Sequence, residues 1–419
     1  MVAAGGRVRE RQTHRVERPA LPVRRSPVLD VFVWSRLAIW GAALFTLLTL
    51  QGARNPGAAQ LDDRTLTHDF GAVTDVWARW DSVWFLRIAE HGYDQASPSG
   101  AGAAFFPLYP AAVRVLGLAL FGHFVLAGIL VSLGASLAAF YLLHQIAEER
   151  LGVDGARRAV LYLAVFPFTF FLIAVYSEAL FLLLSLVAFA LAERGRWAGA
   201  WVATGLTLLT RAAGVALVPA LLLLAWRSTE RRRALSTFPI AIGLGCLYPA
   251  YLWRELGDPL AFARAQGFWH RHISPAGPLG GLWDGLRAGW AGVEQLASRS
   301  SAVTYWAAVT DTDPMRVALI NLASLVFLAL FAYLTLVCWR RLGAPYGLFC
   351  ALSLAIPLCT PSAQWPLQSL PRLGIVVFPY FLALAVLGGR PRIHTAILAV
   401  SALLLGVAVT QWALWQWVA

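Results

Sequence analysis

Long apolar runs recur along the chain from residue 31 to its end, and short polar stretches separate them. About 20 apolar residues in helical form are long enough to cross the hydrocarbon core of a bilayer. The pattern therefore predicts an all-α polytopic membrane protein with about eleven transmembrane helices and a long helical first outer loop. The expected spans are 31–50, 124–147, 159–176, 178–193, 197–210, 212–226, 235–253, 316–339, 345–360, 374–389 and 394–418.

The segment 105–122 is apolar as well, but Pro107, Pro110 and Arg114 interrupt it. If it is a re-entrant or interfacial helix rather than a span, 20 arginines fall on one side of the membrane. They lie in the short segments 1–29, 148–158, 194–196, 227–234, 340–344 and 390–393. Short arginine-rich loops stay on the cytoplasmic side. The N-terminus is therefore expected in the cytoplasm, with the long loops 51–123 and 254–315 outside.

Composition narrows the class of protein further. Apolar residues make up 59% of the chain and charged residues only 13%, too few for a soluble domain of this size. The net charge of +12 rests on arginine alone, mostly in short loops, so nucleic acid is not an expected partner. We expect residues 1–30 to form a disordered basic arm and residues 31–419 a single transmembrane domain. The arginine-only, alanine-rich composition is typical of a GC-rich bacterium, so the bacterial plasma membrane is the expected location.

The sequence lacks the short motifs of soluble enzymes, including the P-loop, the GxGxxG fingerprint, HExxH and GxSxG. Its four cysteines lie in apolar runs without metal-ligand spacing, which predicts no disulfide framework. The pair His270 and His272 lies two residues apart in an outer loop. This spacing does not put both rings on one helical face, so solvated histidines are favoured over a metal pair.

The stretch 77–94 places an acid among aromatic residues. Read as one helix, it puts Trp77, Trp84 and Phe85 on the same face as Asp81. A helix lying on the membrane would explain the tryptophans, but it would push the carboxylate of Asp81 towards lipid. We therefore expect Asp81 to face a protein cavity, with the three aromatic side chains lining a substrate groove.

Three further charged residues lie at the ends of apolar runs. Glu178 follows Ser177 at the start of a span, where it serves either a functional site or the first turn of a helix. Arg211 lies between two short apolar runs and needs an anion, a wet cavity or a route to the membrane surface. Arg372 stands just outside a span, as a functional residue or an interfacial anchor.

Five segments occur in an order that resembles the PIG-V family, which contains GPI mannosyltransferase II and bacterial relatives within the GT-C glycosyltransferase superfamily. They are RWDSVWFLRIAEHGYD (79–94), AFFPLYP (104–110), YSEALF (176–181), LTRAAG (209–214) and SLPRLGIVVFPYFLALA (369–385). Leu370 and Leu373 stand where the family tends to have Met and Tyr. The loop 254–315 matches only loosely, so the identity of the acceptor does not carry over.

The resemblance implies a GT-C-like bundle that transfers a hexose from a polyprenyl-phosphate donor to an acceptor hydroxyl at the outer face. Mannose is the expected sugar, and one displacement would invert the anomeric centre. Asp81 would be the general base. Arg211 and Arg372 would hold the donor phosphate, with Arg87 and His91 behind them. Glu178 would position the acceptor or bind a divalent metal such as Mg or Mn.

Two alternatives stay open at this point. A lipid-linked sugar transporter or flippase would share the many spans and the charges within them, although no internal repeat is detectable. A GT-C enzyme with another donor sugar, arabinose or glucose, would share the whole site. The acceptor could be a lipid-linked saccharide, a glycan or a protein.

Overall fold

The computed structural model describes residues 27–50, 69–93, 100–298, 314–363, 365–416 and 418. Across these residues the secondary structure is helical, apart from a single isolated bridge between Arg271 and Ser362. The predicted all-α class is therefore confirmed. Most of the predicted arm 1–30, and the first-loop acids Asp62 and Asp63, lie outside the described residues.

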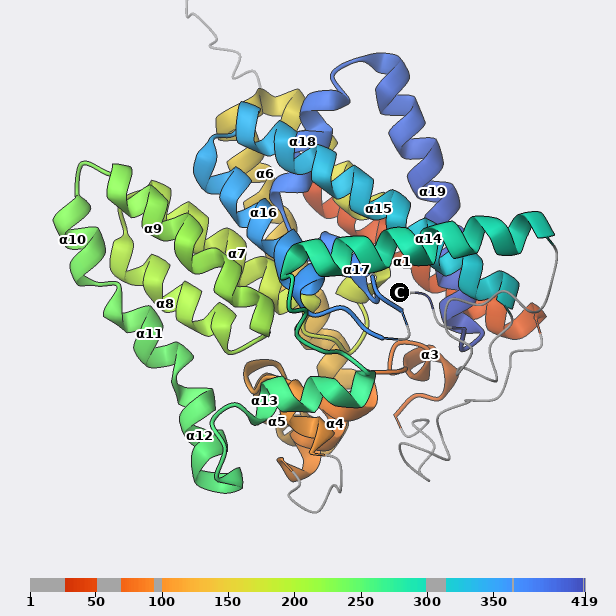
Figure 1. Ribbon diagram of the computed structural model, residues 1–419, viewed down its shortest axis with the longest axis horizontal. Coiled ribbons are helices and arrows are strands. Elements are labelled where there is room, and N and C mark those ends of the chain that lie inside the picture. The colour runs from red at the N-terminus through yellow and green to blue at the C-terminus, as the bar shows by residue number, and fades with distance from the viewer. Residues whose placement is uncertain are drawn as a thin grey trace, which may run out of the picture.

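The helices follow one another in a single bundle (Figure 1). Those of ten or more residues are α1 (Pro27–Thr49), α4 (Ser82–His91), α5 (Leu108–Ala119), α6 (Phe124–Val165), α7 (Glu178–Glu193), α8 (Trp197–Leu208), α9 (Leu217–Arg227), α12 (Leu247–Leu256), α14 (Pro278–Ser298), α15 (Pro314–Arg341), α16 (Ala344–Cys359) and α19 (Pro391–Ala413). Shorter elements are α3 (Ala72–Asp75), η1 (Ala101–Ala104), η2 (Thr169–Leu172), η3 (Ala212–Ala216), α10 (Arg231–Ser236), α11 (Pro239–Gly245), α13 (Ala261–Arg264), η4 (Ala265–Trp269), α17 (Leu370–Leu373), η5 (Gly374–Val376) and α18 (Pro379–Leu387).

Several of these helices are long and apolar enough to cross a bilayer, so this is a multi-pass membrane protein. Within the described residues the candidate spans are α1, α6, α15, α19 and the stretch Arg231–Leu256, which comprises α10, α11 and α12. The bent pair Leu370–Val376 and Pro379–Leu387, which meet at 89°, could add one further span.

The predicted number of eleven spans is not confirmed, because apolar runs do not report where the backbone breaks. The run 159–176 is one example: its helix ends at Val165, and η2 and turns follow. The run 345–360 forms α16, whose 16 residues are about 24 Å long. The segment 105–122 contains α5, whose 12 residues are too short for a span, as predicted.

The arginine-rich connections meet at one end of the bundle. Arg194 forms an ion pair of 2.6 Å with Glu149, and Arg150 pairs with Glu193. Arg158 donates to the carbonyl of Ala385 at 3.0 Å. These contacts bring together the connections around residues 150, 194 and 388. Figure 1 shows the start of α19 at the top of the molecule, with α4, α5, α12 and α13 at the bottom.

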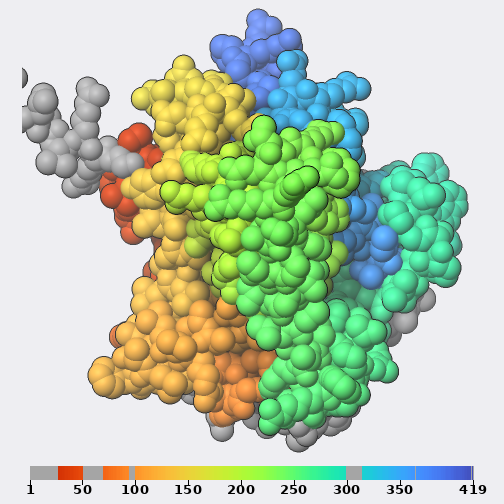
Figure 2. Space-filling model, turned by 90° about the vertical axis from the view of Figure 1, so that its left-hand side faces the viewer, coloured from red at the N-terminus to blue at the C-terminus, as the bar shows by residue number. Residues whose placement is uncertain are grey.

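Near the other end, the two predicted outer loops pack on each other. Phe106 of the first loop lies 5.5 Å from Phe262 of the second between ring centroids, and Phe105 lies 5.5 Å from Trp269. Figure 2 shows the green residues of this region beside the orange residues of α4 and α5. This contact makes one wall of the cavity described below.

Candidate active site

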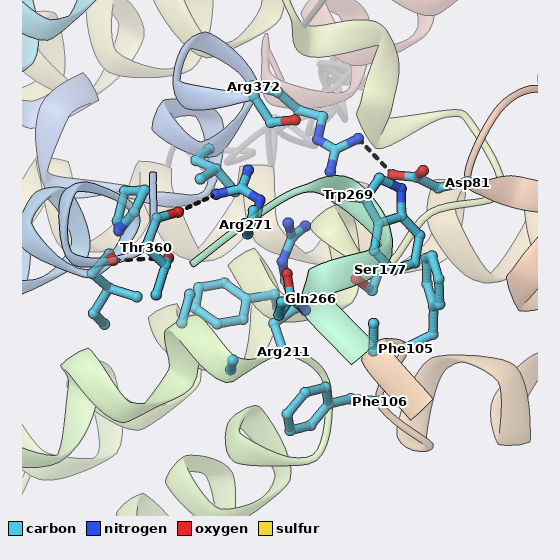
Figure 3. Close-up of a pocket in the computed structure, with 18 of the residues that line it drawn as sticks. Asp81, Phe105, Phe106, Ser177, Arg211, Gln266, Trp269, Arg271, Thr360 and Arg372 are labelled. Carbon is cyan, nitrogen blue, oxygen red and sulfur yellow. Dashed lines mark hydrogen bonds and ion pairs between the residues drawn. The ribbon is translucent and has the colours of Figure 1, made fainter. Parts of the chain in front are cut away.

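A cavity of about 390 Å³ opens where the loop 51–123, α7, η3, the segment 262–273 and α17 converge. Five charged side chains line it, each from a different part of the chain: Asp81, Glu178, Arg211, Arg271 and Arg372. Figure 3 shows Asp81, Arg211, Arg271 and Arg372 arranged around the same space. The structure therefore brings together four residues that the sequence singled out, and it adds Arg271.

Asp81 directly precedes α4, and a buried tyrosine holds its backbone. Tyr176 donates a hydrogen bond to the carbonyl of Arg79 at 3.1 Å and accepts one from the Asp81 amide at 3.0 Å. Trp80 has a left-handed backbone with φ of 56°, which turns the chain sharply before the helix begins. The carboxylate then meets Arg372, with 2.9 Å between Oδ2 and Nη1.

The expected single helix over 77–94 is wrong, and this changes the aromatic groove. Because α4 begins only at Ser82, Trp77 belongs to a preceding turn and its side chain is fully buried against Trp40. Trp84 stacks on Phe105 with 5.7 Å between ring centroids, behind the cavity wall. Phe85 does line the cavity, as expected. The helical periodicity used for the prediction does not hold across a left-handed residue.

Glu178 is the first residue of α7, and its side chain is 1% exposed. Its Oε1 lies 2.5 Å from Nη1 of Arg211 and 3.3 Å from Nε of Arg372. These approaches are ion pairs without hydrogen-bond alignment, and neither carboxylate oxygen has a hydrogen-bond partner within the described part of the chain. Ser177 makes no side-chain capping bond. The alternative of a purely helix-starting role does not account for two buried arginines directed at one carboxylate.

The two arginines reach the acids from breaks in the helical bundle. Arg211 has an extended backbone between α8 and η3, so its side chain turns inward rather than along a helix to the membrane surface. Arg372 lies in α17 and its guanidinium is 5.3 Å from the ring centres of both Tyr176 and Phe171. Both arginines lie within apolar sequence, where a buried charge needs an ionic partner.

Arg271 is the site residue that the sequence interpretation missed. The motif FWHRH drew attention to His270 and His272, whereas the arginine between them enters the cavity. Its Nη1 donates to the carbonyl of Thr360 at 3.0 Å and its Nη2 to that of Gln368 at 2.9 Å. Burial lowers the pKa of Arg271 to about 10, so it still carries its charge at neutral pH. The sequence signal that could have identified Arg271 is an arginine next to aromatic residues in the predicted outer loop 254–315.

Arg87 and His91 do not line the cavity, which corrects the expectation that they support the phosphate site. They lie further along α4, about 9 and 15 Å from Asp81 along the helix axis. The side chain of His91 is 59% exposed and lies 3.5 Å from Glu90. The helix that positions Asp81 therefore carries these two residues away from it.

The described residues contain no group of three or more His, Cys, Asp and Glu side chains that could hold a metal ion. Asp81 and Glu178 face arginine guanidinium groups, which occupy the positions that Mg²⁺ or Mn²⁺ would need.

Comparison with known proteins bears on these same residues. A family model described as Mannosyltransferase (PIG-V) matches residues 66–225. The resemblance to PIG-V mannosyltransferases is thus confirmed over that stretch. It contains Asp81, Glu178 and Arg211, whereas Arg271 and Arg372 lie beyond it.

Curated relatives show the same partial likeness. The chain is 36% identical over 129 residues to GPI alpha-1,6-mannosyltransferase 2 of Homo sapiens, covering 28% of this chain and 25% of that protein. It is 38% identical over 135 residues to the protein of that name from Cricetulus griseus, covering 29% and 26%. The matched region thus spans about a quarter of the length of these relatives.

Solved structures resemble the chain over most of its length, at low identity. An Archaeoglobus fulgidus oligosaccharyltransferase, in complex with Zn and sulfate, has a TM-score of 0.46 at 12% identity and covers 92% of this chain and 53% of its own. Apo ArnT from Cupriavidus metallidurans has a TM-score of 0.40 at 16% identity and covers 91% and 77%.

Proposed function

We propose that this protein is a membrane glycosyltransferase that moves a hexose, with mannose as the expected sugar, from a polyprenyl-phosphate donor to an acceptor hydroxyl. One observation carries the proposal: two carboxylates and three arginines from five separate segments converge in a single cavity whose remaining walls are largely apolar. The match of residues 66–225 to PIG-V mannosyltransferases supports the same chemistry.

Asp81 is the proposed general base. Arg372 lies 2.9 Å from its Oδ2 and holds the carboxylate in place, which leaves Oδ1 to accept the proton of the acceptor hydroxyl. The acceptor oxygen attacks the anomeric carbon as its proton passes to Asp81. The bond from that carbon to the phosphate oxygen breaks, and its electron pair stays on the phosphate. A single displacement of this kind inverts the anomeric centre.

Glu178 is proposed to position the acceptor or the sugar. Its two oxygens have no hydrogen-bond partner within the described residues, and hydroxyl groups would satisfy them. Arg211 and Arg372 are proposed to contact the donor phosphate from the side of the carboxylates. Together these groups would fix the reacting atoms in one geometry, which is the main contribution that a fixed polar site makes to catalysis.

A lipid-linked donor suits the apolar part of the cavity. Ile356 and Pro357 of α16 line it together with Val376, Val377 and Phe181. This wall can accept the first isoprene units of a polyprenyl chain while the phosphate stays near the arginines.

We also propose an orientation for the protein in the membrane. The arginine-rich connections meet at one end of the bundle, through pairs such as Arg194 with Glu149. The positive-inside rule assigns that end to the cytoplasm, which supports a cavity served from the outer face of a bacterial plasma membrane.

The direct test replaces Asp81 by Asn and measures transfer of labelled mannose from polyprenyl phosphate in membranes, at equal protein level. Loss of the base should reduce transfer by about 10²–10⁴-fold. Asp154→Asn is the matched control, because the Asp154 side chain is 83% exposed in the middle of α6. Unchanged transfer by Asp81→Asn would remove it as the base. Movement of the sugar-lipid across the bilayer without covalent transfer would favour the flippase instead.

A further inference from the structure

The charges of the cavity do not cancel among themselves. Asp81 pairs with Arg372, and Glu178 pairs with Arg211 and also approaches Arg372. These four residues are two acids and two bases. Arg271 is a third base, and no described carboxylate lies within ion-pair distance of it. With all five groups ionised, the cavity carries one positive charge that rests on Arg271.

Arg271 is held firmly in place, but by neutral groups. The carbonyl oxygens of Thr360 and Gln368 accept two of its N–H bonds. A guanidinium has five N–H donors in a rigid fork, so others stay available for a ligand. An enclosed cation without a counter-charge is unfavourable, and the lowered pKa of this side chain is a consequence of that enclosure. An anionic ligand would remove the imbalance.

Backbone pairing fixes the segment that carries Arg271 to the end of α16. The amide of His272 donates to the carbonyl of Pro361 at 3.2 Å, and that of Ser274 donates to Cys359 at 2.9 Å. The amide of Ala363 donates to the carbonyl of His270 at 2.8 Å. The guanidinium is therefore positioned by main-chain bonds that most substitutions at residue 271 would leave intact.

Its place in the cavity suits a group that joins a lipid to a sugar. In Figure 3, Arg271 lies between Thr360, at the end of α16, and the pair formed by Asp81 and Arg372. The apolar wall of α16 begins at Ile356 and Pro357, one turn before Thr360. An anion bound at Arg271 can thus extend an apolar chain along α16 and present its other substituent to Asp81.

We propose that Arg271 is the principal ligand of the donor's phosphate, and that Arg211 and Arg372, which also hold the two carboxylates, contact the phosphate from the opposite side. The inference rests on the proposed transferase function and assigns the anion site to the second outer loop, outside the stretch matched by the family model. When the bond from the anomeric carbon to oxygen breaks, the phosphate diester becomes a monoester and gains one negative charge. The guanidinium of Arg271, which no carboxylate neutralises, would stabilise that added negative charge.

The test compares binding of polyprenyl phosphate and of uncharged polyprenol to the full-length protein in nanodiscs. Arg271→Gln should weaken binding of polyprenyl phosphate at least about tenfold and leave polyprenol binding unchanged. Arg264→Gln is the matched control: Arg264 belongs to the same loop, its side chain is 73% exposed, and it pairs with Asp258. This control should bind both lipids as the wild type does.

Each outcome decides one of the two proposals. If the wild type binds polyprenyl phosphate and transfers sugar, but Arg271→Gln binds it equally well, the assignment of Arg271 is overturned and the transferase stands. If the wild type neither prefers polyprenyl phosphate over polyprenol nor transfers sugar, the transferase proposal fails. The assignment of Arg271 then fails as well, because it depends on that proposal. Should Arg271→Gln not fold, Arg271→Lys replaces it. Lysine keeps the charge without the fork, so a several-fold loss is expected, and affinity equal to the wild type would overturn the assignment.

Discussion

Arginine occurs at both ends of this bundle, in two contrasting environments. At the end where the short connections meet, Arg194 pairs with Glu149, and both side chains are about half exposed. In the cavity, Arg372 is 11% exposed and faces Glu178, which is 1% exposed. The first kind of pair is solvated and contributes little to stability, whereas the second is enclosed and costly to break. The same residue type thus forms solvated pairs at one end and an enclosed polar cluster in the cavity, and burial distinguishes the two.

The two ends of the bundle should differ most in the side of the membrane that they face. Single cysteines at Val115 and Glu230, in a background with all four native cysteines replaced by Ala, should react differently with an impermeant thiol reagent added outside intact cells. Val115 is 73% exposed and Glu230 lies near the arginine-rich connections. We expect labelling at 115 and none at 230. Labelling of 230 from outside would reverse the orientation.

Arg372→Gln should have the largest effect on stability. It removes the partner of Asp81 and one of the two guanidinium groups at Glu178, leaving buried acid less compensated. We expect a loss of about 3–5 kcal/mol in unfolding free energy, together with loss of transfer. The double variant Arg372→Gln with Glu178→Gln should recover part of the stability but none of the activity. Thermal unfolding in detergent and a transfer assay measure the two. A single variant as stable as the wild type would contradict a tightly coupled cluster.

Tyr176→Phe should have an intermediate effect. It deletes the hydroxyl that joins the Arg79 carbonyl to the Asp81 amide, without changing the ring that packs at Phe171. A misplaced base slows the chemical step more than it weakens binding, so we expect kcat to fall about tenfold with KM nearly constant. Tyr346→Phe is the matched control: its hydroxyl donates to Glu193 at the arginine-rich end of the bundle, so this variant should keep kcat. A change confined to KM would argue against a positioning role for Tyr176.

Arg194→Gln should have the smallest effect. Its partner Glu149 is 55% exposed and water can replace the lost charge, so stability should change by no more than about 1 kcal/mol. Transfer should equal that of the wild type. A large loss of stability or of transfer would mean that this pair contributes as much as an enclosed pair, and the two ends would no longer differ.

The sequence singled out four of the five charged residues of the cavity, because a charged side chain in apolar surroundings is costly without a partner or a function. Asp81, Glu178, Arg211 and Arg372 each stand out as an ionic group beside or within an apolar run, and the structure brings all four to one cavity. Arg271 does not stand out in this way, because it lies in a polar loop next to two histidines. Trp77 misled the prediction, because a residue with left-handed backbone between it and Asp81 ended the helical periodicity.

What the sequence determined by itself is the class of protein: apolar runs and arginine-rich connections specify an all-α membrane protein, since hydropathy and charge act locally. The tertiary structure decided which acid meets which base. Asp81 and Arg372 are 291 positions apart, and main-chain bonds to residues about 90 positions away place the segment that carries Arg271. Such pairings depend on where helices break and how they pack, and no local pattern of residues records that.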